Sequence, residues 1–163
     1  MKNILIIGYG NTIRSDDGVG YHIAELCEDL FVSSPSLQYF VKCLSVHQLI
    51  PELAEPISQS DLVIFIDAYP ANDRENDLKV NNITLSPEAL ENATISTSAL
   101  GLHNNDPVSL LNLSQYLYEN SPPAWLILIP ASNFDFGEVF SSLTEGAIAP
   151  ALKRIHELIN QCQ

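Results

Sequence analysis

The chain has 163 residues, of which 46% are hydrophobic and 17% are charged, a composition typical of a globular protein rather than a disordered one. Its 7 basic and 20 acidic residues give a formal net charge of −13, which excludes the basic surface needed to bind nucleic acid or an anionic membrane. No apolar run approaches the roughly 20 residues that span a bilayer. The three cysteines lack CxxC spacing, so we expect reduced thiols in a cytoplasmic protein. The length predicts one domain, residues 1–163.

Short apolar runs alternate along the chain with stretches of helical periodicity. We expect strands at 2–8, 37–44, 61–67 and 125–130, because near-continuous apolar runs of this length are typical of strands covered on both faces. Helices are expected at 17–31, 47–58, 106–118 and 139–161. The apolar stripe of the first helix is assigned to Val19, Ile23, Leu26 and Leu30.

This alternation predicts an α/β fold, a three-layer α/β/α sandwich around a mostly parallel five-stranded sheet of the phosphorylase/hydrolase-like kind. The segment LKVNNITL, residues 78–85, follows a polar loop and could supply an edge strand, in either the parallel or the antiparallel sense. No repeat or linker interrupts the pattern.

The first strand runs into GYGNTIRSDDGVG, residues 8–20, which suggests two opposite kinds of site. Gly8 and Gly10 fit the start of a dinucleotide-binding loop, but Ile13 stands where the third glycine is needed. No acidic residue that could hold a ribose ends the second strand. Asp16 and Asp17 would repel a phosphate at the helix N-terminus. A pair of aspartates there could also serve only as a helix cap.

A carboxylate also ends the third strand, where VIFID closes with Asp67. A charge in that place is costly unless it is paired or binds a cation, although a strand-ending Asp can also cap the next turn. His103 lies in a later polar loop. Loops that follow parallel strands meet at one edge of the sheet, so we expect Asp17, Asp67 and His103 to converge. Such a mixed oxygen and nitrogen set with open positions suits nickel or zinc.

The other histidines and Arg14 carry weaker signals. His47 follows the second strand and could reach the same edge, whereas His22 and His156 lie within helices and are interpreted as surface or packing residues. Arg14 could orient a carboxylate or contact a substrate, and a loop arginine can equally be solvated. Cys27, Cys43 and Cys162 are interpreted as buried or inert.

Three segments together carry a family resemblance. The pattern G-x-G-N-x-x-R-x-D-D-G-x-G after the first strand, F-x-D-A at the end of the third, and PPAWLILIPASNFDFGEVFS followed by ALKRI resemble the hydrogenase maturation proteases over nearly the whole chain. HQLIPELAE is similar to cyanobacterial members that act on the bidirectional, NAD-linked enzyme. The turn CLSVHQ, residues 43–48, differs from the Asp-Gly-Gly-Thr-like turn of many members.

The resemblance implies an aspartic-type endopeptidase whose partner is the precursor of the nickel–iron hydrogenase large subunit. Such enzymes remove a C-terminal extension after nickel insertion, and the nickel belongs to the substrate as its recognition element. Zinc or cadmium could occupy the site in vitro. The family's ligands fall on Asp17, Asp67 and His103, the first being Glu in many members.

The mechanism that we expect is hydrolysis of an amide assisted by the substrate's nickel, with Asp16 as the nearest candidate base. The chain is expected to act as a monomer, without nucleic acid or membrane. Two alternatives stay open: a nickel-handling chaperone that cleaves nothing, and a Rossmann-like cofactor-binding module.

Overall fold

The computed structural model describes residues 1–32, 38–91 and 106–162. Their centre is a five-stranded sheet in the order β2-β1-β3-β5-β4. The strands are β1 (Lys2–Tyr9), β2 (Tyr39–Val46), β3 (Leu62–Pro70), β4 (Lys79–Asn82) and β5 (Ala124–Ala131). Neighbouring strands are parallel except β4, which pairs with β5 in the antiparallel sense. The mostly parallel sheet with an antiparallel edge strand is therefore confirmed.

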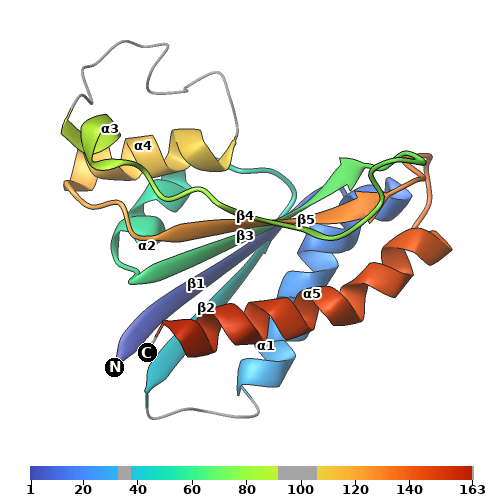
Figure 1. The fold of residues 1–163 in the computed structure, drawn as a ribbon, viewed down its shortest axis with the longest axis horizontal. Coiled ribbons are helices and arrows are strands. Elements are labelled where there is room, and N and C mark those ends of the chain that lie inside the picture. The colour runs from blue at the N-terminus through green and yellow to red at the C-terminus, as the bar shows by residue number, and fades with distance from the viewer. Residues whose placement is uncertain (33–37, 92–105, 163) are drawn as a thin grey trace.

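Helices cover both faces of this sheet (Figure 1). One face packs against α1 (Val19–Val32) and α5 (Ser142–Gln161), and the other against α2 (Ala54–Ser58) and α4 (Pro107–Tyr118). Short 3₁₀ turns, η1 (Ser15–Gly18) and η2 (Pro51–Leu53), precede α1 and α2, and α3 (Pro87–Glu91) follows β4. The three-layer arrangement is thus as predicted.

The strand sequences explain why the sheet lies in the middle. In β1, Ile4 and Ile6 join the core on the α1 and α5 side, whereas Leu5 and Ile7 join the core on the opposite side. Successive side chains of a strand point to opposite faces, so a continuous apolar run supplies both cores at once.

The apolar stripe predicted for the first helix is partly wrong. Val19 and Ile23 are buried as expected, but the stripe continues through Cys27, while Leu30 is 54% exposed. The buried positions of α1 follow steps of four residues, and Leu30 falls beyond that stripe on the helix surface.

Within the described ranges, no helix is long and apolar enough to cross a membrane.

Candidate functional site

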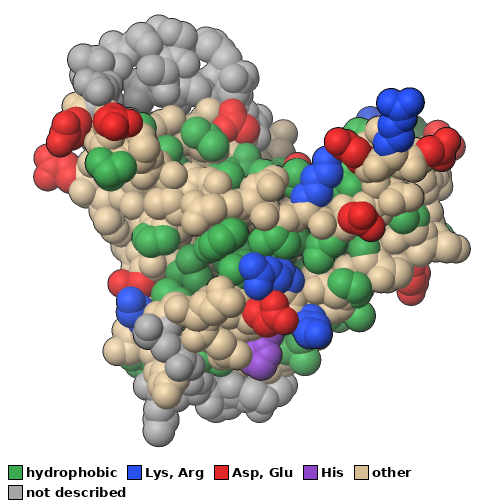
Figure 2. Space-filling model, viewed as in Figure 1, with side chains coloured by type: hydrophobic (Ala, Val, Ile, Leu, Met, Phe, Trp, Pro, Cys, Tyr) green, Lys and Arg blue, Asp and Glu red, His purple; other side chains and the backbone are tan. Residues whose placement is uncertain are grey.

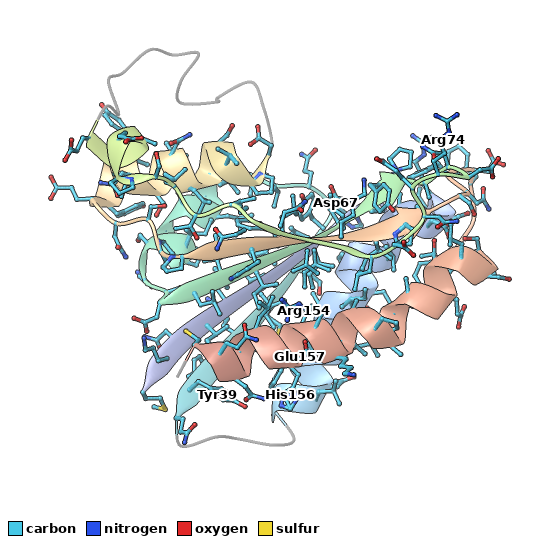
Figure 3. The ribbon with its side chains drawn as sticks, in the orientation of Figure 1. Tyr39, Asp67, Arg74, Arg154, His156 and Glu157 are labelled. Carbon is cyan, nitrogen blue, oxygen red and sulfur yellow. The ribbon has the colours of Figure 1, made fainter. Side chains whose placement is uncertain are left out.

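The site expected from the sequence lies where the order of the strands reverses. The chain leaves β1 toward β2 on one side of the sheet and returns to β3 on the other. In open α/β sheets, ligands bind at such a switch point, beyond the carboxyl ends of the strands. The surface is hollowed between α4 and the loops that follow β3 and β5 (Figure 2), and Asp67 is seen at the foot of this hollow in the same orientation (Figure 3).

Glycines close the loop after β1 and bring the start of α1 against the sheet. Gly10 has a φ of 146°, and a Cβ there would lie 1.8 Å from the carbonyl oxygen of Asp17. A Cβ on Gly20 would lie 2.3 Å from the carbonyl oxygen of Ile66. Only glycine permits both contacts, so the loop folds back on itself and sets Asp17 beside the end of β3.

The same loop offers no cradle for a phosphate. The backbone N–H groups of residues 10, 11 and 13 to 17 all donate hydrogen bonds within the protein. Those of residues 10 and 11 donate to Val46 O and Asp17 Oδ2, and those of residues 13 and 14 to Asn11 Oδ1 and Asn11 O. Those of residues 15, 16 and 17 donate to Gly137 O, Asn133 O and Arg14 O. A phosphate site at a helix N-terminus depends on amides that are free to donate to the ligand. The geometry therefore argues against the Rossmann-like alternative.

Asp17 is held in place by the loop that it closes. Its Oδ2 accepts a hydrogen bond from the backbone N–H of Asn11 at 2.9 Å, and the side chain is half-buried. It lies near enough to Asp67 for its charge to raise the pKa of that carboxyl. The two carboxylates therefore lie within electrostatic reach of each other.

Asp67 lies near the carboxyl end of β3, half-buried on the α4 side of the sheet. Its pKa is raised from 3.8 to about 6, because burial and, to a smaller extent, the charge of Asp17 outweigh the hydrogen bonds from the backbone of Ala68 and from Tyr9, which lower it. The Ala68 N–H lies 2.7 Å from Oδ1. Asp67 is therefore a half-buried carboxylate whose pKa lies closer to neutral pH than that of an ordinary aspartate.

Tyr9, the last residue of β1, is a site residue that the sequence reasoning missed. Its ring is buried in the core beneath α4, and its hydroxyl hydrogen-bonds to Asp67. Burial and the charges of Asp67 and Asp106 raise the pKa of Tyr9 far above its ordinary value. It is therefore a neutral donor that fixes the Asp67 carboxylate. The sequence feature that could have identified Tyr9 is an aromatic residue with a polar hydroxyl group at the end of an apolar strand.

Asp106 directly precedes α4 and caps it, accepting hydrogen bonds from the backbone N–H of Ser109 at 2.9 Å and from the Ser109 hydroxyl at 2.8 Å. Its effect on Tyr9 places it at the same end of the sheet. His103, the third predicted ligand, lies outside the described residues, so its approach to Asp17 and Asp67 stays a prediction.

Asp16 is placed very differently from its neighbour. Its side chain is fully buried and accepts hydrogen bonds from the backbone N–H groups of Ser132, Asn133 and Ser141 and from the Ser141 hydroxyl, at 2.7–2.9 Å. Burial raises its pKa, but these hydrogen bonds outweigh burial and hold it below its ordinary value. Such a carboxylate is a poor base, so the structure corrects the role expected for Asp16: it anchors the loop between β5 and α5.

The remaining sequence candidates have structural partners. The Nε of Arg14 donates to the carbonyl oxygen of Phe134 at 3.2 Å. Each of the three histidine rings lies beside an aromatic ring. The ring centroids are 5.5 Å apart for His47 and Tyr21, 5.4 Å for His22 and Phe140, and 6.5 Å for His156 and Phe31. The packing interpretation of His22 and His156 therefore fits the structure, and Arg14 helps to hold the loop after β5.

The described part of the chain brings two ligand-type carboxylates together and contains no group of three His, Cys, Asp or Glu side chains that could hold a metal. Two carboxylates leave most of the coordination sphere of a divalent ion open.

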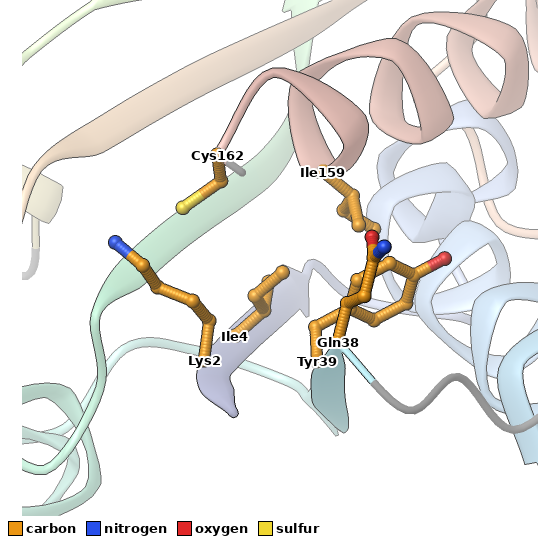
Figure 4. A pocket seen from close by; sticks show the side chains of 6 residues that line it. All are labelled: Lys2, Ile4, Gln38, Tyr39, Ile159 and Cys162. Atoms are coloured by element: carbon orange, nitrogen blue, oxygen red, sulfur yellow. The ribbon is translucent and has the colours of Figure 1, made fainter.

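A separate cavity of about 290 Å³ lies at the opposite end of the sheet (Figure 4). It is lined by Lys2, Ile4, Gln38, Tyr39, Ile159 and Cys162. Lys2 begins β1 and Tyr9 ends it, so roughly 20 Å of strand separates this cavity from the carboxylates.

The sequence matches no protein-family model and no curated protein. Solved structures share the fold, however. The [NiFe] hydrogenase maturation protease HybD from Thermococcus kodakarensis has a TM-score of 0.67 at 20% identity, covering 96% of this chain and 98% of that one. The hydrogenase 2 maturation peptidase from a Thaumarchaeota archaeon gives 0.64 at 20%, covering 97% and 98%. The hydrogenase maturating endopeptidase HybD from E. coli gives 0.59 at 18%, covering 98% and 93%.

Proposed function

We propose that this chain is an endopeptidase that removes the C-terminal extension from the precursor of the nickel–iron hydrogenase large subunit after nickel insertion. One observation carries the proposal: Asp17 and Asp67 approach each other at the switch point of the sheet, in a fold shared with hydrogenase maturation proteases over nearly the full length of both chains.

In this proposal the two carboxylates recognise the nickel that the substrate carries. Asp17 and Asp67 take open coordination positions on an ion already held by cysteines of the precursor, with His103 as the third ligand. The sequence supports His103, because it precedes Asp106 by three residues and Asp106 lies near Tyr9. Nickel accepts carboxylate and imidazole ligands together, and zinc or cadmium could take its place in vitro.

The chemistry proposed is hydrolysis of a single peptide bond. An ion held between the substrate's ligands and these carboxylates polarises the scissile carbonyl group or lowers the pKa of a bound water. The hydrogen bonds from Tyr9 and Ala68 orient the Asp67 carboxylate, as outer partners of metal ligands commonly do. Asp16 is left out of the reaction because its oxygens are enclosed.

The test compares nickel-loaded with nickel-free precursor, with cleavage followed by mass spectrometry. We expect cleavage of the loaded form alone, and loss of cleavage in Asp17→Asn and Asp67→Asn. Asp73→Asn is the matched control, since that carboxylate is exposed on the loop after β3 and should leave the rate unchanged. Full activity in both site variants would rule out the proposed site, and equal cleavage of both precursor forms would rule out recognition of nickel.

The same experiment addresses a nickel-handling chaperone. That alternative requires the chain to bind nickel-loaded precursor and leave it uncut, an outcome that mass spectrometry distinguishes directly.

We further propose that the chain acts as a monomer in the cytoplasm. The free state of Cys27, Cys43 and Cys162 supports a reducing compartment.

A further inference from the structure

Three apolar side chains stand in solvent on two adjoining loops. Ile13, in the loop after β1, is 49% exposed, and Phe136 and Val139, in the loop after β5, are 86% and 78% exposed. We call these three residues the apolar rim. Single exposed apolar side chains are ordinary, but several on neighbouring backbone are a feature of surfaces that bind other molecules.

The apolar rim is built on a fixed backbone. The Gly137 N–H donates to the carbonyl oxygen of Ile13 at 2.9 Å, and the Ser15 N–H donates to the Gly137 carbonyl at 2.8 Å. The Ser15 hydroxyl donates to the carbonyl of Asp135 at 2.8 Å. The exposed side chains therefore stand on two loops that are bonded to each other, which lowers the entropic cost of binding.

The apolar rim is continuous with the candidate site. Ile13 and Asp17 belong to the same short loop, whose ends are tied by the hydrogen bond from the Asn11 N–H to Asp17. The Ser141 N–H binds Asp16, so the loop that carries Phe136 and Val139 is anchored beside Asp17. A protein held at the apolar rim is thus held next to Asp17.

Charge indicates what kind of surface would fit. Asp135 and Glu138 are exposed and flank Phe136 and Val139 in the sequence, in a chain with a net charge of −13. The nearby cation is Arg14, whose Nε is bonded to the Phe134 carbonyl. A partner that places an apolar side chain beside lysine or arginine matches this pattern, and electrostatic complementarity of this kind favours specific association.

We propose that the apolar rim is the docking surface for the body of the protein substrate, where a basic, apolar patch of the precursor covers Ile13, Phe136 and Val139. This inference rests on the proposed function and deepens it. In this inference the apolar rim provides affinity for the precursor, and the carboxylates Asp17 and Asp67 act in the hydrolysis of the peptide bond.

The test is a steady-state comparison with nickel-loaded precursor. The double variant Phe136→Ser, Val139→Ser should raise KM by about tenfold, because apolar anchors dominate binding energy, with kcat within about twofold, as expected when only uniform binding is lost. Leu30→Ser removes a similarly exposed apolar side chain from α1 and should leave both constants unchanged. Asp135→Asn with Glu138→Gln should lower kcat/KM at low salt and have little effect at high salt.

Each result separates the two ideas. If the unmodified chain cleaves no precursor, the proposed function fails and this surface with it. If it cleaves normally and the double variant keeps its KM with an unchanged melting temperature, the surface alone is overturned. If the double variant changes the oligomeric state in sedimentation and leaves KM unchanged, the apolar rim binds a second copy of the chain, and the inference is likewise overturned.

Discussion

At the residue scale, Asp16 and Asp67 lie near the same end of the sheet, yet their pKa values are shifted in opposite directions. Burial raises the pKa of Asp67 to about 6. Burial acts in the same direction on Asp16, but four hydrogen bonds to its carboxylate outweigh it and leave the pKa low. Ionised Asp16 therefore stabilises the fold, and this contribution is lost as the pH falls through its folded pKa. Ionised Asp67 destabilises the fold.

The variant Asp67→Asn should therefore be more stable than the unmodified chain at neutral pH. Between about pH 4 and pH 6 the folded state keeps a proton on Asp67 that the unfolded state releases, so stability falls as the pH rises through this range. At pH 7 the substitution should raise the free energy of unfolding by about 1–3 kcal/mol. The gain should shrink toward zero near pH 4, as measured by urea unfolding.

The control is Asp73→Asn, whose exposed side chain should change stability by less than about 0.5 kcal/mol at either pH. A less stable Asp67→Asn at pH 7 would contradict the prediction. It would mean that the hydrogen bonds from Tyr9 and Ala68 outweigh the cost of burying the charge.

Sequence reasoning placed Asp17 and Asp67 at one edge of the sheet because Asp17 comes soon after β1 and Asp67 lies near the carboxyl end of β3, and the topology alone brings such residues together. It could not assign Asp16. Its carboxylate accepts hydrogen bonds from backbone N–H groups more than 115 residues later in the chain. Every residue type other than proline has such an N–H, so the sequence does not reveal which of them are donors. Tyr9 was missed for a related reason: its partner is defined by the alignment of β1 with β3, not by spacing along the chain.

At the element scale, contact between α1 and the sheet depends on glycine. Gly20 in α1 approaches the carbonyl groups of Ile66 and Tyr9 so closely that a Cβ would lie 2.3 and 2.8 Å from their oxygens. Gly20→Ala should therefore lower the free energy of unfolding by about 1–3 kcal/mol or more, because backbone cannot move aside as a side chain can. Denaturant unfolding followed by circular dichroism measures the effect.

Gly146→Ala is the matched control, since nothing lies within 4 Å of a Cβ at this position in α5. It should stabilise the protein by about 0.5–1 kcal/mol through helix propensity alone. If the two substitutions had equal effects, close packing of α1 on the sheet would not be the reason for Gly20.

The strands were predictable to within two or three residues at each end, because buried parallel strands are nearly uniform apolar runs. The helix surfaces were less so. Leu26 and Leu30 have helical spacing, but which side of α1 faces the sheet is decided by Gly20 and the buried Cys27. The segment 78–85 was placed at the sheet edge correctly, although only Lys79–Asn82 pairs as β4, next to Trp125–Leu128 of β5.

At the scale of the whole molecule, the dominant electrostatic feature is a net charge of −13. The ion pairs found among the described residues are Lys79 with Glu75 and Arg154 with Glu157, both partly exposed. Surface pairs of this kind contribute little, whereas the excess of like charge destabilises the compact state.

Salt should therefore stabilise this protein. Raising NaCl from about 20 to about 200 mM shortens the screening length severalfold, and we expect the melting temperature to rise by a few degrees in a calorimetric scan. The double variant Glu88→Gln, Glu91→Gln in α3 should respond less. A melting temperature that falls with salt would mean that attractive pairs outweigh the net repulsion.

The bond between Asp16 and Ser141 joins positions 125 residues apart, and this separation has a consequence for synthesis. At about 5–20 residues per second on a ribosome, roughly ten seconds pass between the emergence of the aspartate and that of its partner. Throughout that interval the carboxylate can remain solvated, and the loop after β1 lacks its hydrogen bonds to the segment after β5. The edge of the sheet that carries Asp17 and Asp67 is thus completed only when the last strand and the start of the last helix have been made.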